Sequence, residues 1–127
     1  HESAEFCKTL KKNTPKEINI IKVFSILDTF DFDLLKPFET GCDYFLFDTK
    51  GKLPGGNGST FDWKVLENYP STKPFFLSGG IGISEMSAVN EISKTNLPLY
   101  AIDINSKFEI EPGLKNIELL NIIVERF

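Results

Sequence analysis

The sequence predicts an α/β fold made of parallel strands that alternate with helices. Short apolar runs typical of buried strands begin near residues 18, 44, 75 and 99. Helical or polar segments separate these starts by roughly 25–30 residues, which is typical of βα units joined by right-handed crossovers. Four such units form either a small open sheet or half of a closed (βα)₈ barrel, which needs eight units and about 250 residues.

Composition places the chain among single globular domains. Its 127 residues are 41% hydrophobic and include twelve phenylalanines, enough to bury a core. The net charge of −4, without a basic stripe, argues against binding to nucleic acid. No apolar run approaches the roughly 20 residues of a membrane span, and no signal-peptide pattern opens the sequence. Cys7 and Cys42 have no partners at metal-binding spacing, so we expect buried thiols in a cytoplasmic protein.

One helix is expected before the first strand in the sequence and another after it. Ser3 is a good N-cap for a helix over Ala4–Lys12, whose apolar face holds Phe6, Cys7 and Leu10. The strand Ile18–Ser25 is β-branched and apolar almost throughout, which is typical of a strand covered on both faces. A short helix is expected around Phe32–Lys36.

The second strand leads into a glycine-rich loop. Tyr44–Phe47 is aromatic and apolar, and Asp48 stands where this strand is expected to end. The loop at 50–60 is too rich in glycine to be core, and long loops in compact domains are usually disordered or functional. A helix over Trp63–Tyr69 follows. Its N-cap and the two residues of its hydrophobic staple are Asp62, Phe61 and Leu66.

Two further βα units complete the pattern. The third strand is Pro74–Leu77, and a helix from about Ser84 to Ser93 follows it. The fourth strand is Leu99–Ile104, and the last helix runs from about Ile117 to Arg126. The side chains expected to pack inward from these two helices are Met86, Val89, Ile92, Leu120, Ile123 and Val124.

Asp48 is the candidate catalytic residue. In parallel α/β folds the chemistry lies at the carboxyl ends of the strands, and Asp48 stands there, ahead of a glycine-rich loop. On position alone, a carboxylate that only caps a turn explains this residue about equally well.

Two polar turns after the third and fourth strands are typical of a phosphate site. Gly79 and Gly80 follow one strand directly and allow an anion to approach the backbone closely. A Gly-Gly pair alone is more often a tight turn, but Asn105 and Ser106 offer small polar donors at the next strand end. The loops after the last two strands of a (βα)₈ barrel often form such a site. Asp103 either accepts backbone N–H groups or orients substrate hydroxyls.

Together these residues resemble phosphoribosylanthranilate isomerase, a (βα)₈ family of tryptophan biosynthesis. They occur in the family's order and approximate spacing, but only against its second half. The resemblance therefore implies one domain over residues 1–127, the carboxyl-terminal half of a TIM barrel, with strands five to eight. The matching pieces are Asp48-Thr49, Gly55-Gly56-Asn57-Gly58, Phe61-Asp62-Trp63, Leu77-Ser78-Gly79-Gly80-Ile81, and Ala101 to Ser106 through Glu109 to Pro112-Gly113.

The resemblance also implies an activity that needs neither metal nor cofactor. This is the Amadori rearrangement of N-(5′-phosphoribosyl)anthranilate to 1-(2-carboxyphenylamino)-1-deoxyribulose 5-phosphate. Asp48 is then the general acid, and Asp103 contacts the substrate. The implied phosphate-binding residues are Gly79, Gly80, Asn105 and Ser106, and the implied lid loop carries Gly55, Gly56, Asn57 and Gly58.

The sequence departs from the family in two ways. Lys107 stands where the family usually has glycine. The family's first four strands have no counterpart, and with them go a cysteine that acts as general base and an arginine that holds the anthranilate carboxylate. Neither Cys7 nor Cys42 aligns with that base. We expect the fragment to be inactive alone and to pair with an N-terminal half-barrel or a second copy, through an inner face bearing Lys22, Phe24, Phe45, Phe76 and Tyr100.

Two alternatives remain open. One is another phosphate-binding barrel, such as indole-glycerol-phosphate synthase, which the combination of Asp48 with the Gly-Gly-Asn-Gly run disfavours. The other is a half-barrel without catalysis that binds phosphorylated ligands or associates with itself.

Overall fold

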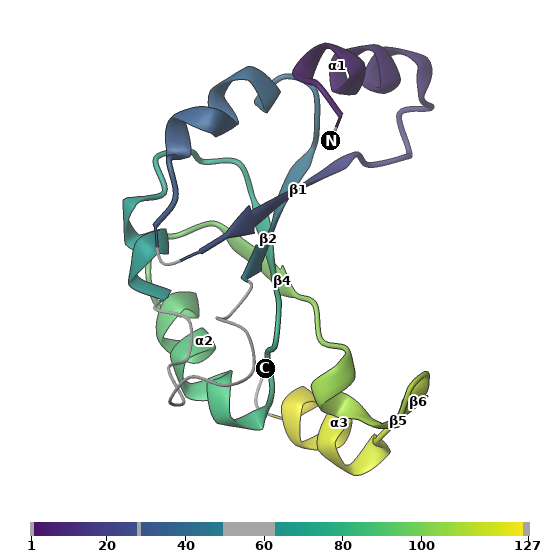
Figure 1. Ribbon diagram of the computed structural model, residues 1–127, viewed down its shortest axis with the longest axis vertical. Coiled ribbons are helices and arrows are strands. Elements are labelled where there is room, and N and C mark those ends of the chain that lie inside the picture. The colour runs from purple at the N-terminus through teal and green to yellow at the C-terminus, as the bar shows by residue number, and fades with distance from the viewer. Residues whose placement is uncertain (1, 28, 50–62, 126–127) are drawn as a thin grey trace.

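The chain forms a four-stranded parallel sheet in the order β1-β2-β3-β4 (Figure 1). The computed structural model describes residues 2–27, 29–49 and 63–125. Each strand pairs in parallel with the next one along the chain, which confirms the predicted order of parallel βα units. The strands are β1 (Ile21–Ile26), β2 (Tyr44–Thr49), β3 (Phe75–Ser78) and β4 (Leu99–Ile102).

Two of the connections between strands contain 3₁₀ helices instead of α-helices. The segments predicted as helices around Phe32–Lys36 and over Trp63–Tyr69 are 3₁₀ helices, η1 (Phe32–Phe38) and η2 (Trp63–Asn68). Pro37 lies inside η1 and lacks the N–H that an α-helix needs there. The remaining helices are α1 (Ala4–Asn13), η3 (Ile83–Glu85), α2 (Met86–Ser93), η4 (Ser106–Phe108) and α3 (Ile117–Val124).

A small antiparallel hairpin precedes α3 and was not predicted. It consists of β5 (Glu109–Glu111) and β6 (Leu114–Lys115). The two residues between its strands are Pro112 and Gly113, and Gly113 has a φ of 86°, which favours glycine. The Pro-Gly pair is therefore a turn signal that the sequence contained.

One face of the sheet packs against the helices and forms the core. Phe45, Phe47, Phe75 and Leu77 alternate with more exposed neighbours along β2 and β3 and are 0% exposed. In Figure 1, η1, η2 and α2 lie along this side of the sheet. The aromatic rings meet largely edge to face, as between Phe24 and Phe45, whose centroids are 5.4 Å apart. From α2, the side chains that pack inward are Met86, Val89 and Ile92, as predicted.

The opposite face of the sheet is open within the described residues. Ile21, Val23 and Tyr100 are 42%, 51% and 61% exposed. Tyr44 and Phe76 join Tyr100 in an aromatic cluster whose ring centroids are 4.8–5.4 Å apart. The expectation that both faces of the first strand are covered is therefore wrong for this chain, and the strand begins at Ile21 rather than Ile18. Three side chains expected on the open face, Lys22, Phe24 and Phe45, lie on the helix-covered face instead.

An ion pair joins helix α1 to the residue that precedes β2. The Ser3 Oγ accepts the Phe6 N–H at 3.1 Å, which confirms the N-cap. Lys11 Nζ donates to Asp43 Oδ1 at 2.5 Å, and Asp43 Oδ2 accepts the Ile20 N–H at 2.7 Å. Only part of the predicted apolar packing is found in the terminal helices, since Cys7 and Ile123 are buried but the exposed side chains include Phe6, Leu10 and Val124.

Candidate functional site

Asp48 lies near the carboxyl end of β2, on the open face of the sheet. The strand extends two residues further than predicted and ends at Thr49. Asp48 pairs in register with Ser78 on β3 and is half-buried. Because the strands are parallel, the residues that follow β3 and β4 lie at the same edge of the sheet as Asp48.

Gly79 brings the turn after β3 against the Asp48 carboxylate. Its φ is 99°, and a Cβ there would lie 2.8 Å from Asp48 Oδ1 and 2.7 Å from the Thr49 nitrogen. A Cβ would also overlap the Thr49 carbonyl oxygen. Glycine is therefore required at this position by both backbone conformation and space. Gly80 also has a positive φ, of 64°, but faces open space.

Thr49 anchors the same turn, a role that the sequence interpretation missed. Its hydroxyl donates to the carbonyl oxygens of Ser78 and Gly79, at 2.8 and 3.0 Å. Thr49 is only 2% exposed, and a buried hydroxyl of this kind needs a partner. The period-2 alternation of β2, which places Thr49 on the buried face with Phe45 and Phe47, was the available signal.

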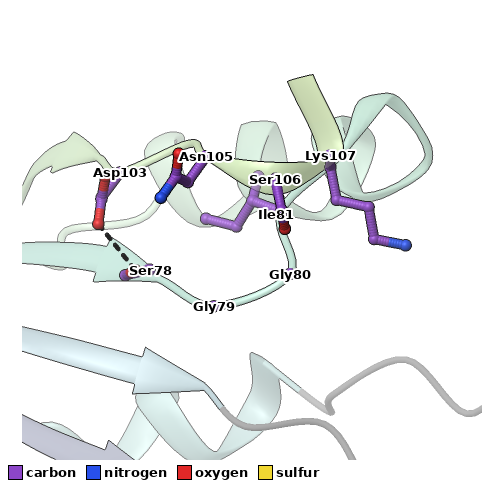
Figure 2. A pocket seen from close by; sticks show the side chains of 8 residues that line it. All are labelled: Ser78, Gly79, Gly80, Ile81, Asp103, Asn105, Ser106 and Lys107. Carbon is purple, nitrogen blue, oxygen red and sulfur yellow. Dashed lines mark hydrogen bonds between the residues drawn. The ribbon is translucent and has the colours of Figure 1, made fainter. Parts of the chain in front are cut away.

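Asp103 is held beside Ser78. The Asp103 N–H donates to the Leu77 carbonyl oxygen at 2.7 Å, so the main-chain pairing of β3 with β4 continues past Ile102. The Ser78 hydroxyl donates to Asp103 Oδ2 at 2.9 Å (Figure 2). Ser78 thus lies between Asp48, its register partner on β2, and Asp103 after β4.

The turns after β3 and β4 enclose a cavity of about 130 Å³. A single water requires about 10–15 Å³ on a comparable measure, so a group of several heavy atoms fits. The structure brings together Asp103 and all four residues predicted for the phosphate site. The lining residues are Ser78, Gly79, Gly80, Ile81, Asp103, Asn105, Ser106 and Lys107 (Figure 2).

Lys107 occupies the rim of this cavity. It lies inside η4, a 3₁₀ helix whose conformation any L-residue adopts, so glycine is not required here. Its stem packs over Gly82, where a Cβ would lie 3.3 Å from the Lys107 Cβ. In Figure 2 its ammonium group points away from the turn at Gly79 and Gly80.

The two cysteines lie away from this edge of the sheet. Cys42 precedes β2, at the end opposite Asp48, and its Sγ donates to the Phe38 carbonyl oxygen at 3.1 Å. Burial raises the pKa of the Cys42 thiol to about 11, so it stays protonated at neutral pH. Cys7 is buried on α1 beside Gly41. Neither thiol is placed to act on a group bound near Asp48.

Some predicted features lie outside the described residues. These are the lid residues Gly55, Gly56, Asn57 and Gly58, the N-cap Asp62 and the staple residue Phe61. In the ranges that the structure describes, no group of three or more His, Cys, Asp or Glu side chains is arranged to hold a metal ion. No helix in those ranges is long and apolar enough to cross a membrane.

Residues 1–126 match the family model described as N-(5′-phosphoribosyl)anthranilate (PRA) isomerase. The chain belongs to the phosphoribosylanthranilate isomerase family. A protein of Parabacteroides distasonis named N-(5′-phosphoribosyl)anthranilate isomerase is 42% identical over 127 residues, which are 99% of this chain and 55% of that protein. The "Tryptophan biosynthesis protein TrpCF" of Helicobacter pylori strain J99 is 40% identical over 107 residues, which are 84% of this chain and 22% of that protein.

A solved structure of the isomerase family shares the fold. The crystal structure of phosphoribosyl anthranilate isomerase from Thermus thermophilus aligns with a TM-score of 0.71 at 23% identity. The alignment covers 99% of this chain and 56% of that one. The chain thus spans about half the length of the isomerase relatives that it matches.

Proposed function

We propose that this chain is the carboxyl-terminal half of a (βα)₈ phosphoribosylanthranilate isomerase, a cytoplasmic enzyme of tryptophan biosynthesis. The supporting observation is that one edge of the sheet gathers Asp48, the Ser78–Asp103 pair and a polar cavity, in a chain of that family. The reaction is the Amadori rearrangement of N-(5′-phosphoribosyl)anthranilate to 1-(2-carboxyphenylamino)-1-deoxyribulose 5-phosphate, and it needs no cofactor.

Asp48 is the general acid in this proposal. Protonation of the furanose ring oxygen by its carboxyl group lets the C1′–O bond break, and the anthranilate nitrogen supplies the electron pair that forms the C1′=N bond. A base then removes the C2′ proton, which leaves the enamine that becomes the ketone. Proton transfer of this kind contributes about 10²–10⁴-fold to the rate. The close approach of Gly79 excludes water from one side of the acid.

The cavity between the turns after β3 and β4 binds the substrate phosphate. Gly79 and Gly80 allow the phosphoryl group to approach the main chain, and Asn105 and Ser106 contribute polar groups from the facing turn. Asp103, held by the Ser78 hydroxyl, accepts a hydrogen bond from a ribose hydroxyl between the phosphate and the reacting carbons. The glycine-rich loop at 50–60 is the lid over the bound substrate.

The general base comes from outside these residues. Cys42 is protonated at neutral pH and lies at the opposite end of β2, and Cys7 is buried on α1. We infer that an N-terminal half-barrel supplies the base. That half would also cover the open face at Ile21, Val23 and Tyr100. Active sites in (βα)₈ enzymes draw residues from the ends of several strands, so a divided set of catalytic groups fits this fold.

The test is an isomerase assay on the 127-residue chain, alone and with the N-terminal half supplied on a second chain. The expected result is turnover of N-(5′-phosphoribosyl)anthranilate only when both halves are present. Turnover by the chain alone at ordinary enzymatic rates, about 1–10³ s⁻¹, would mean that the base has been misidentified. No turnover in the reconstituted protein would refute the proposed activity.

A second function, self-association without catalysis, is favoured by the aromatic cluster of Tyr44, Phe76 and Tyr100, in which Tyr100 is 61% exposed. In that case the chain binds phosphorylated ligands as an oligomer of half-barrels. The two functions differ in substrate turnover. A catalytic half converts substrate when its N-terminal half is added, whereas a binding module holds phosphate but converts no substrate with or without that half.

A further inference from the structure

The unpredicted hairpin reaches back to the rim of the phosphate cavity. Strands β5 and β6 pair Glu109 with Lys115 directly opposite each other. Lys115 Nζ donates to Glu109 Oε1 at 2.7 Å and also donates to Asn105 Oδ1. Glu109 and Lys115 expose only 15% and 35% of their side chains. The three side chains therefore form a chain of contacts that runs from the hairpin to the cavity lining.

The chemistry of Lys115 decides how the Asn105 amide is turned. An ammonium group has only donors, so it bonds to the amide oxygen and not to the amide nitrogen. With Oδ1 occupied, the two N–H donors of Asn105 point the other way. Figure 2 shows this orientation, with the Asn105 nitrogen directed toward the turn at Ser78 and Gly79. The opposite orientation would put an acceptor oxygen into the cavity, where it would repel the oxygens of an anion.

We propose that Lys115 is a positioning residue of the phosphate site: it fixes the Asn105 amide so that the NH₂ group faces the bound phosphoryl group. Glu109 in turn holds Lys115 in place through the cross-strand pair. This inference rests on the phosphate site of the proposed function. It adds to that site a residue ten positions beyond Asn105 that does not line the cavity.

The first measurement is the affinity for inorganic phosphate, by calorimetry on the intact protein. Lys115→Met keeps the length of the side chain and removes its donors, so the Asn105 amide is free to rotate. We expect phosphate to bind about tenfold more weakly, as for one lost hydrogen bond to a charged group. The matched control is Lys94→Met, since Lys94, which follows α2 directly, pairs with Glu91 at 2.8 Å and does not line the cavity. An unchanged affinity in Lys115→Met would overturn the proposal.

A double-mutant cycle separates orientation from charge. If Lys115 acts by turning Asn105, then Lys115→Met causes no further loss in an Asn105→Ala background, because no amide is left to orient. If Lys115 acts only through its positive charge, the tenfold loss appears in both backgrounds, and the proposal is wrong. A structural role elsewhere in the hairpin would give the same result as charge alone.

A measurement on the unmodified protein covers the case in which Lys115→Met does not fold. The side-chain NH₂ resonances of Asn105 should shift on titration with phosphate, and resonances that do not move would overturn the proposal. Isomerase activity is scored separately, on the protein reconstituted with its N-terminal half. Phosphate binding without turnover in that protein refutes the proposed function alone, whereas turnover with an unchanged phosphate affinity in Lys115→Met refutes this inference alone.

Discussion

At the scale of single residues, the setting of Asp48 depends on a neighbour that has no side chain. Gly79 allows the turn after β3 to lie directly against the Asp48 carboxylate and the Thr49 main chain. The Thr49 hydroxyl then bonds the two carbonyl oxygens of that turn. A carboxylate held between a fixed turn and an open face is shielded on one side and accessible on the other, which suits proton transfer to a bound ligand.

Replacing the acid tests its role. In the reconstituted enzyme, Asp48→Asn should lower kcat at least about 10²-fold, because an amide does not donate a proton as an acid does. Phosphate affinity should change little, since Asp48 does not line the cavity proposed to bind phosphate. Steady-state kinetics and phosphate calorimetry measure the two effects. Asp33→Asn, at an exposed position on η1, is the control. A variant that retains more than about a tenth of the wild-type kcat would exclude Asp48 as the acid.

Two adjacent glycines provide a matched pair of variants. Gly79→Ala should destabilise the fold by roughly 2–4 kcal/mol, because it adds both the cost of a positive φ and a collision with Thr49. Gly80→Ala should cost only about 1 kcal/mol, because the same kind of backbone faces open space there. Chemical denaturation measures both variants. Equal losses would show that the close approach at Gly79 has no energetic weight.

At the scale of elements, the sequence predicted the strands, because their positions follow from the hydrophobic pattern. All four strands occur in the predicted order, because apolar runs bounded by polar turns leave few alternatives. The 3₁₀ form of η1 and η2 was missed, since helix type depends on local details such as Pro37. In the candidate site, Asp48, Asp103 and the four residues predicted for phosphate were selected by their places at strand ends, and the structure brings them to one edge of the sheet. Thr49 and Lys115 were missed because their roles depend on tertiary partners.

Helix α1 offers a test of how one ion pair holds an element to the sheet. Burial raises the pKa of Asp43, but the hydrogen bond from the Ile20 N–H and the Lys11 ammonium outweigh it, so the net pKa is lowered. The ionised carboxylate therefore stabilises the fold above its unfolded pKa, about 3.9. This contribution is lost as the pH falls through the still lower pKa of the folded state.

Asp43→Asn should accordingly lower the free energy of unfolding by about 1 kcal/mol at pH 7, since the pair is partly exposed. The difference from wild type should stay constant down to about pH 4 and shrink below it. Denaturation at a series of pH values measures this difference. Asp33→Asn is the control, because its ion pair with Lys36 is more than 70% exposed on both sides and should contribute little. A difference that grows on acidification would contradict the assignment.

At the scale of the whole molecule, the sheet has one face covered by helices and one open face. Helices cover the side that bears Phe45, Phe47 and Phe75, while the opposite side presents an aromatic cluster to solvent. Among the described residues, the outer strands β1 and β4 each pair with one neighbour in the sheet. The candidate site lies on the rim of the same sheet, across β2, β3 and β4, so whatever covers the open face also approaches Asp48.

The open face of the sheet should associate with another chain. Large apolar patches are rare on stable monomers, so the 127-residue chain alone should self-associate, and adding the N-terminal half should convert it to a defined one-to-one complex. Sedimentation velocity measures both states.

Val23→Glu places a charge on the open face, where Val23 is 51% exposed, and should weaken the complex. Leu34→Glu adds the same charge at a 56% exposed position on η1, outside the open face, and should leave the complex intact. A stably folded, monodisperse monomer that does not bind the N-terminal half would refute the half-barrel assignment.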